Sequence, residues 1–593
     1  MVDRTTRLRW RRRFKHSRHR VEDMGVQAEE QLERHLFKRL NKLVSVRRFI
    51  TAWLLLVVLL IGITVVQIRN LGKYYLAAKP VPGGSITEGI IGSFTNANPL
   101  YANSAVDNSV SKLLFASLLK YTEANQLVGD LAESYSVNEN ANVYTVRLRP
   151  DLKWHDGFPL TSADVVFTYG SIQNPDAKSP LYSSWRGITV TAKDALTIEF
   201  ALPSSLSSFP YSLTTGIVPR HLLSGIPPSQ LRSISFNTQN PVGSGPFTWE
   251  AIEVTGSTPE DREQRIALAA NADYYAGRPK LNKLIIRSFL NEENLKTSFD
   301  NQELNAMVGL TTFPSEYNET LEITEFNIPL LSQVMVFFRL SNEILTDVQV
   351  RRALTQATDR AKIMTGLGYP VVPSQGPLLE SHIGFAKDLT QLAYNPTAAA
   401  QLLDAQGWVV GANGIREKNG TPLSFGLFSL DNEEYNRIIN DVAEQWRAIG
   451  VDAKVSPQSD TELQTAISIH SYDALVYGIS VGVDPDVFAY WHSSQASVLA
   501  GSRTNLSEYS SVKADDALEA GRTRTDPAIR SVKYRPFVEA WRDDAPAIAL
   551  YQPRFLYITR GTIHGLNPSS MTTRVERFTN VHNWMIREER QSD

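Results

Sequence analysis

Residues 152–168, LKWHDGFPLTSADVVFT, form the stretch that decides the fold. Asp156 and Gly157 are typical turn residues, because Asp accepts a local backbone hydrogen bond and Gly tolerates positive φ. Thr161 or the serine after it is a suitable N-cap for a following helix, and Asp164 would lie near the positive end of that helix dipole. The stretch therefore predicts a turn followed by a helix, and we expect it to act as scaffold without contacting a ligand.

On both sides of this stretch, short apolar runs typical of strands alternate with patterns typical of helices, from Gly84 to about Asn583. Mixed strands and helices over some 500 residues indicate an α/β or α+β architecture of more than one lobe. The clearest predicted strands are 143–149, 196–200, 284–289, 334–340 and 474–477, and the clearest predicted helices are 109–119, 162–171, 348–365, 397–406 and 433–449.

Residues 49–68, FITAWLLLVVLLIGITVVQI, carry no charge, and fourteen of the twenty are Leu, Ile, Val or Phe. As a helix rising about 1.5 Å per residue, they span the ~30 Å hydrocarbon core of a bilayer. A cleaved signal peptide is the alternative, but 48 residues precede the run and the cleavage-site match after it is poor. The sequence predicts an uncleaved transmembrane anchor.

Charge is divided unevenly by this anchor. Residues 1–48 contain fifteen Lys and Arg and six Asp and Glu, which gives this segment a charge of +9. Because the net charge of the whole chain is −2, the remaining residues carry −11. Because basic flanks stay in the cytoplasm, we expect a single-pass plasma-membrane protein with a cytoplasmic N-terminus and an extracellular or periplasmic C-terminal part. The predicted divisions are a basic cytoplasmic segment (1–48), the anchor (49–68), a stalk (69–83) and a C-terminal tail (584–593).

The arginine-rich stretch 4–20, RTTRLRWRRRFKHSRHR, fixes this topology. Binding of anionic lipid or nucleic acid is the alternative role for it. We expect no nucleic-acid partner.

Several kinds of chemistry are excluded by composition. The chain has no cysteine, which excludes disulfides, thiolate zinc sites, iron–sulfur clusters, a cysteine nucleophile and lipid attachment through an N-terminal cysteine. None of the ten histidines forms an H-E-x-x-H pair, and no G-x-x-x-x-G-K-[ST] phosphate loop is present. We expect no enzyme activity, no cofactor and no metal site, and ATP hydrolysis would need another chain.

The order of motifs resembles extracellular solute-binding protein family 5, the binding proteins of peptide and nickel ABC importers. Residues 152–168 are the most specific of these motifs, and the resemblance extends over about 84–570. The others, in order, are GSI at 84–86, NPL at 98–100, LLFASLLKY at 113–121, LAESY at 131–135, YTVRLR at 144–149, VGSGPF at 242–247, NADYYAGRP at 271–279, DVQVRRAL at 347–354, DP at 484–485 and WRDDAP at 541–546.

The resemblance implies a two-lobed fold of the type II periplasmic-binding-protein kind, in its large peptide-binding class. Lobe I would comprise 84–288 plus 484–583 and lobe II 289–483, with chain crossings near 287–290 and 478–484. The implied function is capture of a peptide-like solute between the lobes and its delivery to an ABC permease whose ATPase is a separate chain. A tethered sensor with the same fold, and a binder of a metal chelate or a sugar, are the alternatives.

Residues before the Asp484–Pro485 pair bear on the ligand. In many peptide-binding relatives an aspartate there pairs with the peptide's amino group, but here residues 480–483 include no acid. The resemblance therefore favours a peptide held mainly by backbone hydrogen bonds, or a different ligand. Asp484 is either a structural residue or an amine ligand, and a glycine in this stretch suits backbone pairing with an extended peptide.

Other candidates come from three places. Residues 93–98, which follow the first strand, offer amide and hydroxyl groups to a ligand. Trp185 lies in the predicted loop SSWRG. Alternation along a strand would make one of Phe337 and Phe338 face the cleft. Trp185 as a packed surface aromatic is the alternative. The predicted ligand-binding residues are Ser93, Phe94, Asn96, Asn98, Trp185, Phe337, Tyr477, Ser480, Gly482 and Asp484.

Overall fold

The computed structural model describes residues 47–256, 258, 262–499, 504–567 and 569–592. Contacts divide the chain into two compact units. The first holds the chain up to Lys79 together with residues from Glu588 onward, and the second is Pro80–Arg587. The predicted basic segment lies outside the described residues except for Arg47 and Arg48.

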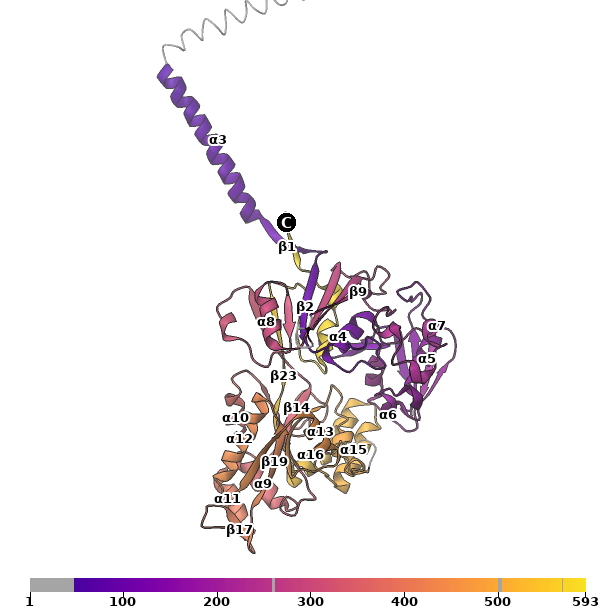
Figure 1. Ribbon diagram of the computed structural model, residues 1–593, viewed down its shortest axis with the longest axis vertical. Coiled ribbons are helices and arrows are strands. Elements are labelled where there is room, and N and C mark those ends of the chain that lie inside the picture. The colour runs from indigo at the N-terminus through magenta and orange to yellow at the C-terminus, as the bar shows by residue number, and fades with distance from the viewer. Residues whose placement is uncertain (1–46, 257, 259–261, 500–503, 568, 593) are drawn as a thin grey trace, which may run out of the picture. The chain divides into compact units, whose positions relative to one another are not determined.

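The first unit is built on one long helix, α3 (Arg47–Tyr75) (Figure 1). Its segment Phe49–Ile68 has a mean hydropathy of 2.8, none of it is buried, and it is long and apolar enough to cross a membrane. The expected stalk and tail are corrected here, because β1 (Leu76–Val81) pairs with β24 (Arg587–Ser592). The sequence did not predict this pairing, because two strands so far apart in the sequence share no local pattern.

Lobe I of the second unit contains a mixed seven-stranded sheet. Its order is β13-β23-β12-β2-β11-β10-β9, with β2 parallel to β11 and β12 and the other neighbours antiparallel. The strands are β2 (Ser85–Ile91), β9 (Phe247–Thr255), β10 (Glu263–Ala270), β11 (Lys283–Phe289), β12 (Ala306–Val308), β13 (Ile323–Pro329) and β23 (Arg554–Arg560).

An antiparallel four-stranded sheet of order β5-β6-β8-β7 and a short β3–β4 hairpin extend lobe I, and their apolar side chains join the same core as the large sheet. The strands are β3 (Leu119–Tyr121), β4 (Leu127–Gly129), β5 (Ala132–Val137), β6 (Val143–Leu148), β7 (Thr189–Ala192) and β8 (Thr197–Ala201). The helices of lobe I are α4 (Ala105–Leu114), α5 (Ser162–Ile172), α6 (Tyr182–Trp185), α7 (Arg220–Leu223), α8 (Glu292–Asp300) and the 3-10 helices η4 (Phe209–Thr214) and η10 (Arg574–Phe578).

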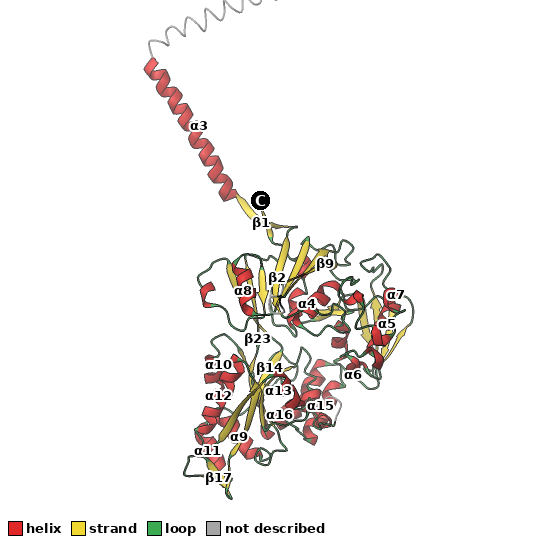
Figure 2. Ribbon diagram, viewed as in Figure 1, coloured by secondary structure: helices red, strands yellow, loops and turns green. Residues whose placement is uncertain are grey.

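Lobe II contains a six-stranded sheet of order β15-β22-β14-β21-β19-β20, with helices on both faces (Figure 2). The strands are β14 (Ser332–Phe338), β15 (Val372–Pro373), β19 (Ser424–Leu430), β20 (Asp452–Gln458), β21 (Ala474–Ser480) and β22 (Ala547–Gln552), beside a small sheet of β16 (Val409–Val410), β17 (Arg416–Lys418) and β18 (Thr421–Pro422). The helices are α9 (Val348–Ala357), α10 (Arg360–Gly366), α11 (Pro396–Ala405), α12 (Glu433–Arg447), α13 (Asp460–Ser468), α14 (Phe488–Trp491), α15 (Val512–Arg522) and α16 (Pro527–Asp544).

The chain crosses between the lobes at places other than those expected near 287–290 and 478–484. It leaves the lobe I sheet at the end of β13 and returns between β22 and β23, so lobe I runs to Pro329 and resumes at Arg554. The two crossings lie side by side, since the Leu330 N–H donates to the Pro553 carbonyl at 2.8 Å. The predicted boundaries differ from these because the sheet to which each of β12, β13 and β22 belongs is set by pairing with strands distant in the sequence.

The predicted scaffold stretch is joined to two other motifs. The Gly243 N–H donates to His155 Nδ1 at 3.1 Å, and the His155 N–H donates to the Gly243 carbonyl at 2.8 Å. A Cβ on Gly243 would lie 1.9 Å from the Leu114 carbonyl oxygen at the end of α4, so only glycine fits there. The Thr161 N–H donates to Asp164 at 2.9 Å at the start of α5, as expected of a helix start.

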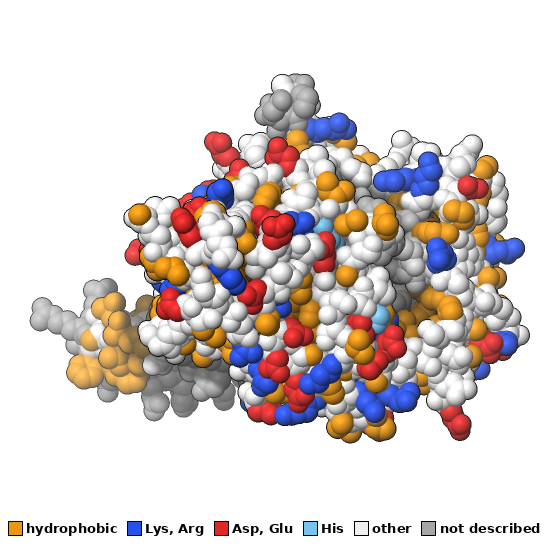
Figure 3. Space-filling model, turned by 90° about the horizontal axis from the view of Figure 1, so that it is seen from below, with side chains coloured by type: hydrophobic (Ala, Val, Ile, Leu, Met, Phe, Trp, Pro, Cys, Tyr) orange, Lys and Arg blue, Asp and Glu red, His pale blue; other side chains and the backbone are white. Residues whose placement is uncertain are grey.

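Acidic and basic side chains are interspersed over the face of the molecule shown in Figure 3. The −11 charge outside residues 1–48 is therefore not gathered into one patch on that face.

Candidate binding cleft

A cavity of about 480 Å³ lies where the two lobes meet the chain crossings. Lobe I contributes residues at the carboxyl end of β12, and lobe II contributes residues at the carboxyl ends of β19 and β21. Loops at the carboxyl ends of strands are where α/β sheets usually bind ligands, and the volume suits a small ligand. The lining residues are Gly309, Leu310, Thr311, Tyr369, Leu430, Asn432, Glu434, Tyr435, Asp460, Leu463, Gln464, Tyr477, Gly478, Pro553, Arg554, Phe555, Leu556 and Arg574.

Glu434, in the first turn of α12, is the acid most firmly held in this cavity. The hydroxyls of Tyr369 and Tyr551 each donate to one of its carboxylate oxygens. Burial raises the pKa of both tyrosines and the Glu434 charge raises it further, so both hydroxyls stay protonated as donors.

Arg554 begins β23 and is fixed by several partners. Its guanidinium donates to Glu325 at 3.2 Å, to the Thr311 carbonyl at 2.9 Å, and to Asn327, and it stacks 3.7 Å from the Tyr369 ring centre. Burial lowers the pKa of Arg554, against the opposing effect of Tyr369 and Glu325. The arginine and the Tyr369–Glu434 pair thus form one connected wall that spans the crossing between the lobes.

Aromatic side chains line the lobe II side of the cavity. Tyr435 on α12 and Tyr477 on β21 both face it, and Gln464 of α13 donates to the Tyr477 hydroxyl at 3.4 Å. A Cβ at Gly478 would lie 2.9 Å from the Tyr435 hydroxyl oxygen, so this glycine lets the tyrosine lie against the strand. Aromatic walls with a few fixed polar groups are typical of small-ligand sites.

The predicted residue Tyr477 lines the cavity, and three other predicted residues lie close to the second half of β21. Ser480 is exposed, and its carbonyl accepts from the Tyr490 hydroxyl at 2.7 Å. Gly482 has φ +67°, donates to the Leu331 carbonyl at 2.9 Å, and so lies next to the crossing. Their contact with a ligand stays a prediction.

Asp484 is buried and bound to Arg530. The guanidinium donates to its two carboxylate oxygens at 2.6 and 2.8 Å. Burial alone would lower the pKa of Arg530, but the hydrogen bonds and charge of Asp484 raise it above its usual value. This geometry favours the structural interpretation of Asp484, because an amine ligand would have to displace the arginine.

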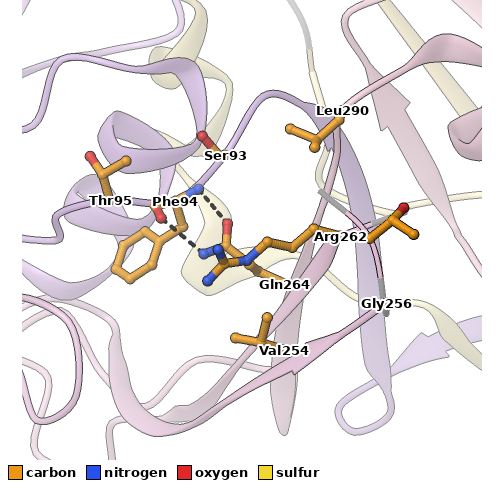
Figure 4. A pocket seen from close by; sticks show the side chains of 9 residues that line it. Ser93, Phe94, Thr95, Val254, Gly256, Arg262, Gln264 and Leu290 are labelled. Atoms are coloured by element: carbon orange, nitrogen blue, oxygen red, sulfur yellow. Dashed lines mark hydrogen bonds between the residues drawn. The ribbon is translucent and has the colours of Figure 1, made fainter. Parts of the chain in front are cut away.

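Ser93 and Phe94 line a different cavity, of about 760 Å³, at the carboxyl end of β2 (Figure 4). Gln264 of β10 holds this loop, since it accepts from the Phe94 N–H at 2.7 Å and donates to the Phe94 carbonyl at 3.0 Å. Leu290, which follows β11, and Val254, on β9, complete the apolar part of the lining (Figure 4).

Asn96 and Asn98 are buried and serve the turn after β2. Asn96 accepts from the Asn98 N–H at 2.9 Å, and Asn98 accepts from the Leu100 N–H at 3.0 Å and donates to Asn237. Their polar groups are occupied by the protein itself, which is the usual state of buried amides.

The structure corrects the predicted positions of the aromatic rings of Trp185, Phe337 and Phe338. Trp185 lies in α6, not in a loop, is 2% exposed, and stacks on Tyr169 with ring centres 3.9 Å apart. Phe337 and Phe338 are both fully buried, because helices cover both faces of the lobe II sheet. Phe337 packs on Trp491 with ring centres 5.8 Å apart, so alternation along β14 sends neither ring to the cleft.

Prediction from the sequence missed Tyr369, Glu434, Arg554 and Arg574. A usable signal existed for Glu434, which follows a strand-like run and an Asn N-cap at the start of a predicted helix. For Arg554 no such signal existed, since its place in the cleft depends on the pairing of β23 with strands distant in the sequence.

Comparison with known proteins decides the family. The model of the bacterial extracellular solute-binding proteins, family 5 (middle), matches residues 126–498. The chain belongs to this family. The predicted resemblance is confirmed, and membership makes the chain a solute-binding protein and not an enzyme.

Relatives cover nearly the whole second unit. The oligopeptide-binding protein AppA of Bacillus subtilis (strain 168) is 28% identical over 496 residues, covering 80% of this chain and 88% of that one. A putative ABC transporter peptide-binding protein of Brucella ovis is 26% identical over 494 residues, covering 80% and 89%.

Solved structures agree with the two-lobed fold. AppA from Bacillus subtilis in complex with a nonapeptide has a TM-score of 0.69 at 26% identity and covers 86% of this chain and 100% of that one. NikZ from Campylobacter jejuni in complex with Ni(L-His) has a TM-score of 0.71 at 25% identity, covering 84% and 99%. The predicted two-lobed α/β architecture is thereby confirmed.

Proposed function

We propose that this protein captures a peptide-like solute in the cleft between its lobes and delivers it to an ABC importer whose permease and ATPase are separate chains. The observation that carries the proposal is the cavity lined from both lobes at the chain crossings, with tyrosines and fixed polar groups on its walls. The names of the peptide-binding relatives support a peptide as the ligand.

We also propose that Phe49–Ile68 anchors the receptor in the plasma membrane, with the N-terminus in the cytoplasm and the second unit outside. The uncharged segment Phe49–Ile68, none of which is buried, and the +9 charge of residues 1–48 support this arrangement. In this arrangement the helix takes the place of a lipid attached through an N-terminal cysteine, since the chain has no cysteine.

Thermal unfolding of the detergent-solubilised full chain tests the proposal. A pool of peptides of two to nine residues should raise the unfolding temperature, because ligand at one hundred times its Kd adds about 2.7 kcal/mol to the stability of the native state. Gln464→Trp should remove this increase, since Gln464 is exposed on α13 and lines the cavity, so a bulkier side chain fills the space without disturbing the core.

Thr461→Trp is the matched control, on an exposed position of the same helix outside the cavity lining. It should keep the full response to peptide. No response of the unaltered chain to any peptide, together with a response to a nickel–histidine complex or to sugars, would replace the peptide in this proposal.

A further inference from the structure

We infer that the protein has a second binding site, for a small uncharged molecule with an apolar body and one amide or hydroxyl group, in a pocket of lobe II beside the chain crossings. The pocket has a volume of about 220 Å³. None of the residues that line it also lines the cleft cavity of about 480 Å³. The two sites are therefore separate, and the inference does not depend on which solute the cleft takes.

The strand pair β15–β22 lies between this pocket and the cleft cavity. Tyr551 and Gln552 are consecutive on β22, so their side chains point to opposite faces of the strand. The Tyr551 hydroxyl donates to Glu434, which lines the cleft cavity, whereas Gln552 lines the pocket. Val372 of β15 pairs with Gln552, and Ser374 follows two residues later, so both share the face of Gln552. The pocket thus lies on the face of these strands that is turned away from the cleft.

Two buried polar side chains in the pocket lack a partner in the protein. Ser374 is 3% exposed, and its hydroxyl has no hydrogen-bond partner among the described residues. Gln552 is 8% exposed, and its side-chain amide makes no hydrogen bond within the described part of the chain. Buried polar groups are usually paired, because an unpaired one destabilises the native state. A ligand group that bonds to both side chains is therefore favoured at this position.

The backbone of Ser374 is firmly held. Its N–H donates to the Leu550 carbonyl at 3.1 Å. Its own carbonyl accepts from the Gln391 amide at 3.1 Å and from the Arg360 guanidinium at 3.3 Å. With the backbone fixed in this way, the hydroxyl stays directed into the pocket when a ligand arrives, which favours selective binding.

Apolar side chains form another part of the wall. Leu331, Leu378 and Leu379 are buried, and Phe385 is half-buried. A buried water molecule needs two to four polar partners, which this part of the wall does not supply. An apolar body fits it better. The volume is below the range of about 300–1,000 Å³ typical of pockets for drug-sized ligands, so the ligand is small.

The lining also excludes a charged ligand. Glu380 is the single charged side chain among the described residues that line the pocket, and it is exposed and lies 3.5 Å from Lys387. A charged group that entered from water would lose its hydration without gaining an ion pair. An amide or a hydroxyl group, by contrast, both donates and accepts, as do the side chains of Ser374 and Gln552.

Fluorine NMR of the full chain in lipid nanodiscs tests the inference. The probes are para-fluorobenzamide and para-fluorobenzyl alcohol, which are uncharged, and para-fluorobenzoate and para-fluorobenzylammonium, which have the same ring and a charge. The unaltered chain should bind the uncharged probes roughly tenfold more tightly than the charged ones. Nanodiscs without protein correct for uptake of the probes into lipid.

Variants assign the binding to this pocket. Ser374→Ala and Gln552→Leu should each weaken binding of the uncharged probes roughly fivefold, because each loses one hydrogen bond. Ser381→Trp should abolish it, since Ser381 is exposed and lines the pocket, so a bulkier side chain fills the space without disturbing the core. Thr461→Trp, exposed outside both linings, is the matched control. Gln464→Trp, which fills the cleft, should leave binding of the probes unchanged.

Unchanged unfolding temperatures of the variants exclude misfolding as the cause. Equal binding of charged and uncharged probes would overturn the inference. Binding of no probe would overturn it as well and would show that the pocket holds only water. Loss of binding in Gln464→Trp together with full binding in Ser381→Trp would place the probes in the cleft and contradict a second site.

Discussion

At the scale of single residues, the contact between His155 and Gly243 explains why the most recognisable stretch of the sequence is scaffold. It joins the turn at 154–157 to the glycine turn at 243–245 and to the end of α4. The expectation that His155 and Asp156 contact no ligand fits their bonds to Gly243, Gly245 and His221. The turn and the helix cap were predictable because they depend on residues close together in the sequence.

Gly243→Ala should destabilise the protein by about 2 kcal/mol or more, because the new Cβ would overlap the Leu114 carbonyl oxygen 1.9 Å away. Denaturant unfolding measures the change. The control is Gly170→Ala, on α5 with open space around the added Cβ, which should be neutral or stabilising. Equal stability of the two variants would show that the close approach is absent.

Stability should fall as the pH drops from about 6.5 to about 4. Burial lowers the pKa of His155 to about 4, and burial lowers the pKa of His382 and His582 as well. The unfolded chain therefore binds more protons than the native state in this window, and acid favours unfolding. For His155 alone we expect the free energy of unfolding to fall by on the order of 2 kcal/mol. His155 is only half-buried, so solvent makes this loss smaller than the full pKa difference would give.

His155→Gln should reduce the slope of stability against pH in that window, measured by denaturant unfolding at pH 4.5, 5.5 and 6.5. An unchanged slope in His155→Gln would contradict a buried neutral imidazole.

At the scale of elements, period and capping predicted most helices and strands, and distant pairing decided the rest. The helix predicted at 348–365 is broken into α9 and α10 because Asp359 caps a new start by accepting from the Lys362 N–H. The helix predicted at 109–119 begins four residues earlier and ends at Leu114, where a strand follows soon after. Neither interruption leaves a mark in hydrophobic periodicity.

A contact between elements of the two lobes should help to set closure. The Ser208 hydroxyl, which precedes η4 of lobe I, donates to Asp486 of lobe II at 2.7 Å, and Asp486 also binds Arg522 at 3.2 Å. Ser208→Ala should weaken ligand binding several-fold, because a hydrogen bond of this kind contributes about 1 kcal/mol to the closed form. Titration calorimetry with a peptide that binds the unaltered chain measures this change in affinity.

The control for this contact is Ser205→Ala in the same loop, whose hydroxyl donates within lobe I to the Asn140 carbonyl. It should leave affinity unchanged. Equal affinities in the two variants would show that the Ser208 contact has no part in closure.

At the scale of the whole molecule, the sequence allowed prediction of the family and the two-lobed architecture, but not of the division between the lobes. The family could be predicted because the order of its motifs can be read directly from the sequence. The lobe boundary could not, because β22 and β23 are adjacent in the sequence and yet belong to different sheets. The same reason limits prediction of the site: Tyr477 was found on its own strand, while Arg554 reaches the cleft only because β23 pairs with strands distant in the sequence.

Protease added outside intact cells should remove the second unit and leave a short membrane-bound fragment that contains Phe49–Ile68. Detection with an antibody against residues 1–48 measures the fragment. Protection of the second unit until the cells are lysed would contradict the proposed orientation, and release of an intact receptor into the medium would indicate that the apolar run is cleaved.

The central claim is that the cleft between the lobes holds a peptide-like solute. Native mass spectrometry of the full chain, purified from its own membrane without added ligand, tests this most directly. The account predicts one bound molecule per chain whose fragments are amino acids, absent from Gln464→Trp and present in Thr461→Trp. A bound metal chelate or sugar in that position, or peptide retained equally by Gln464→Trp, would contradict it.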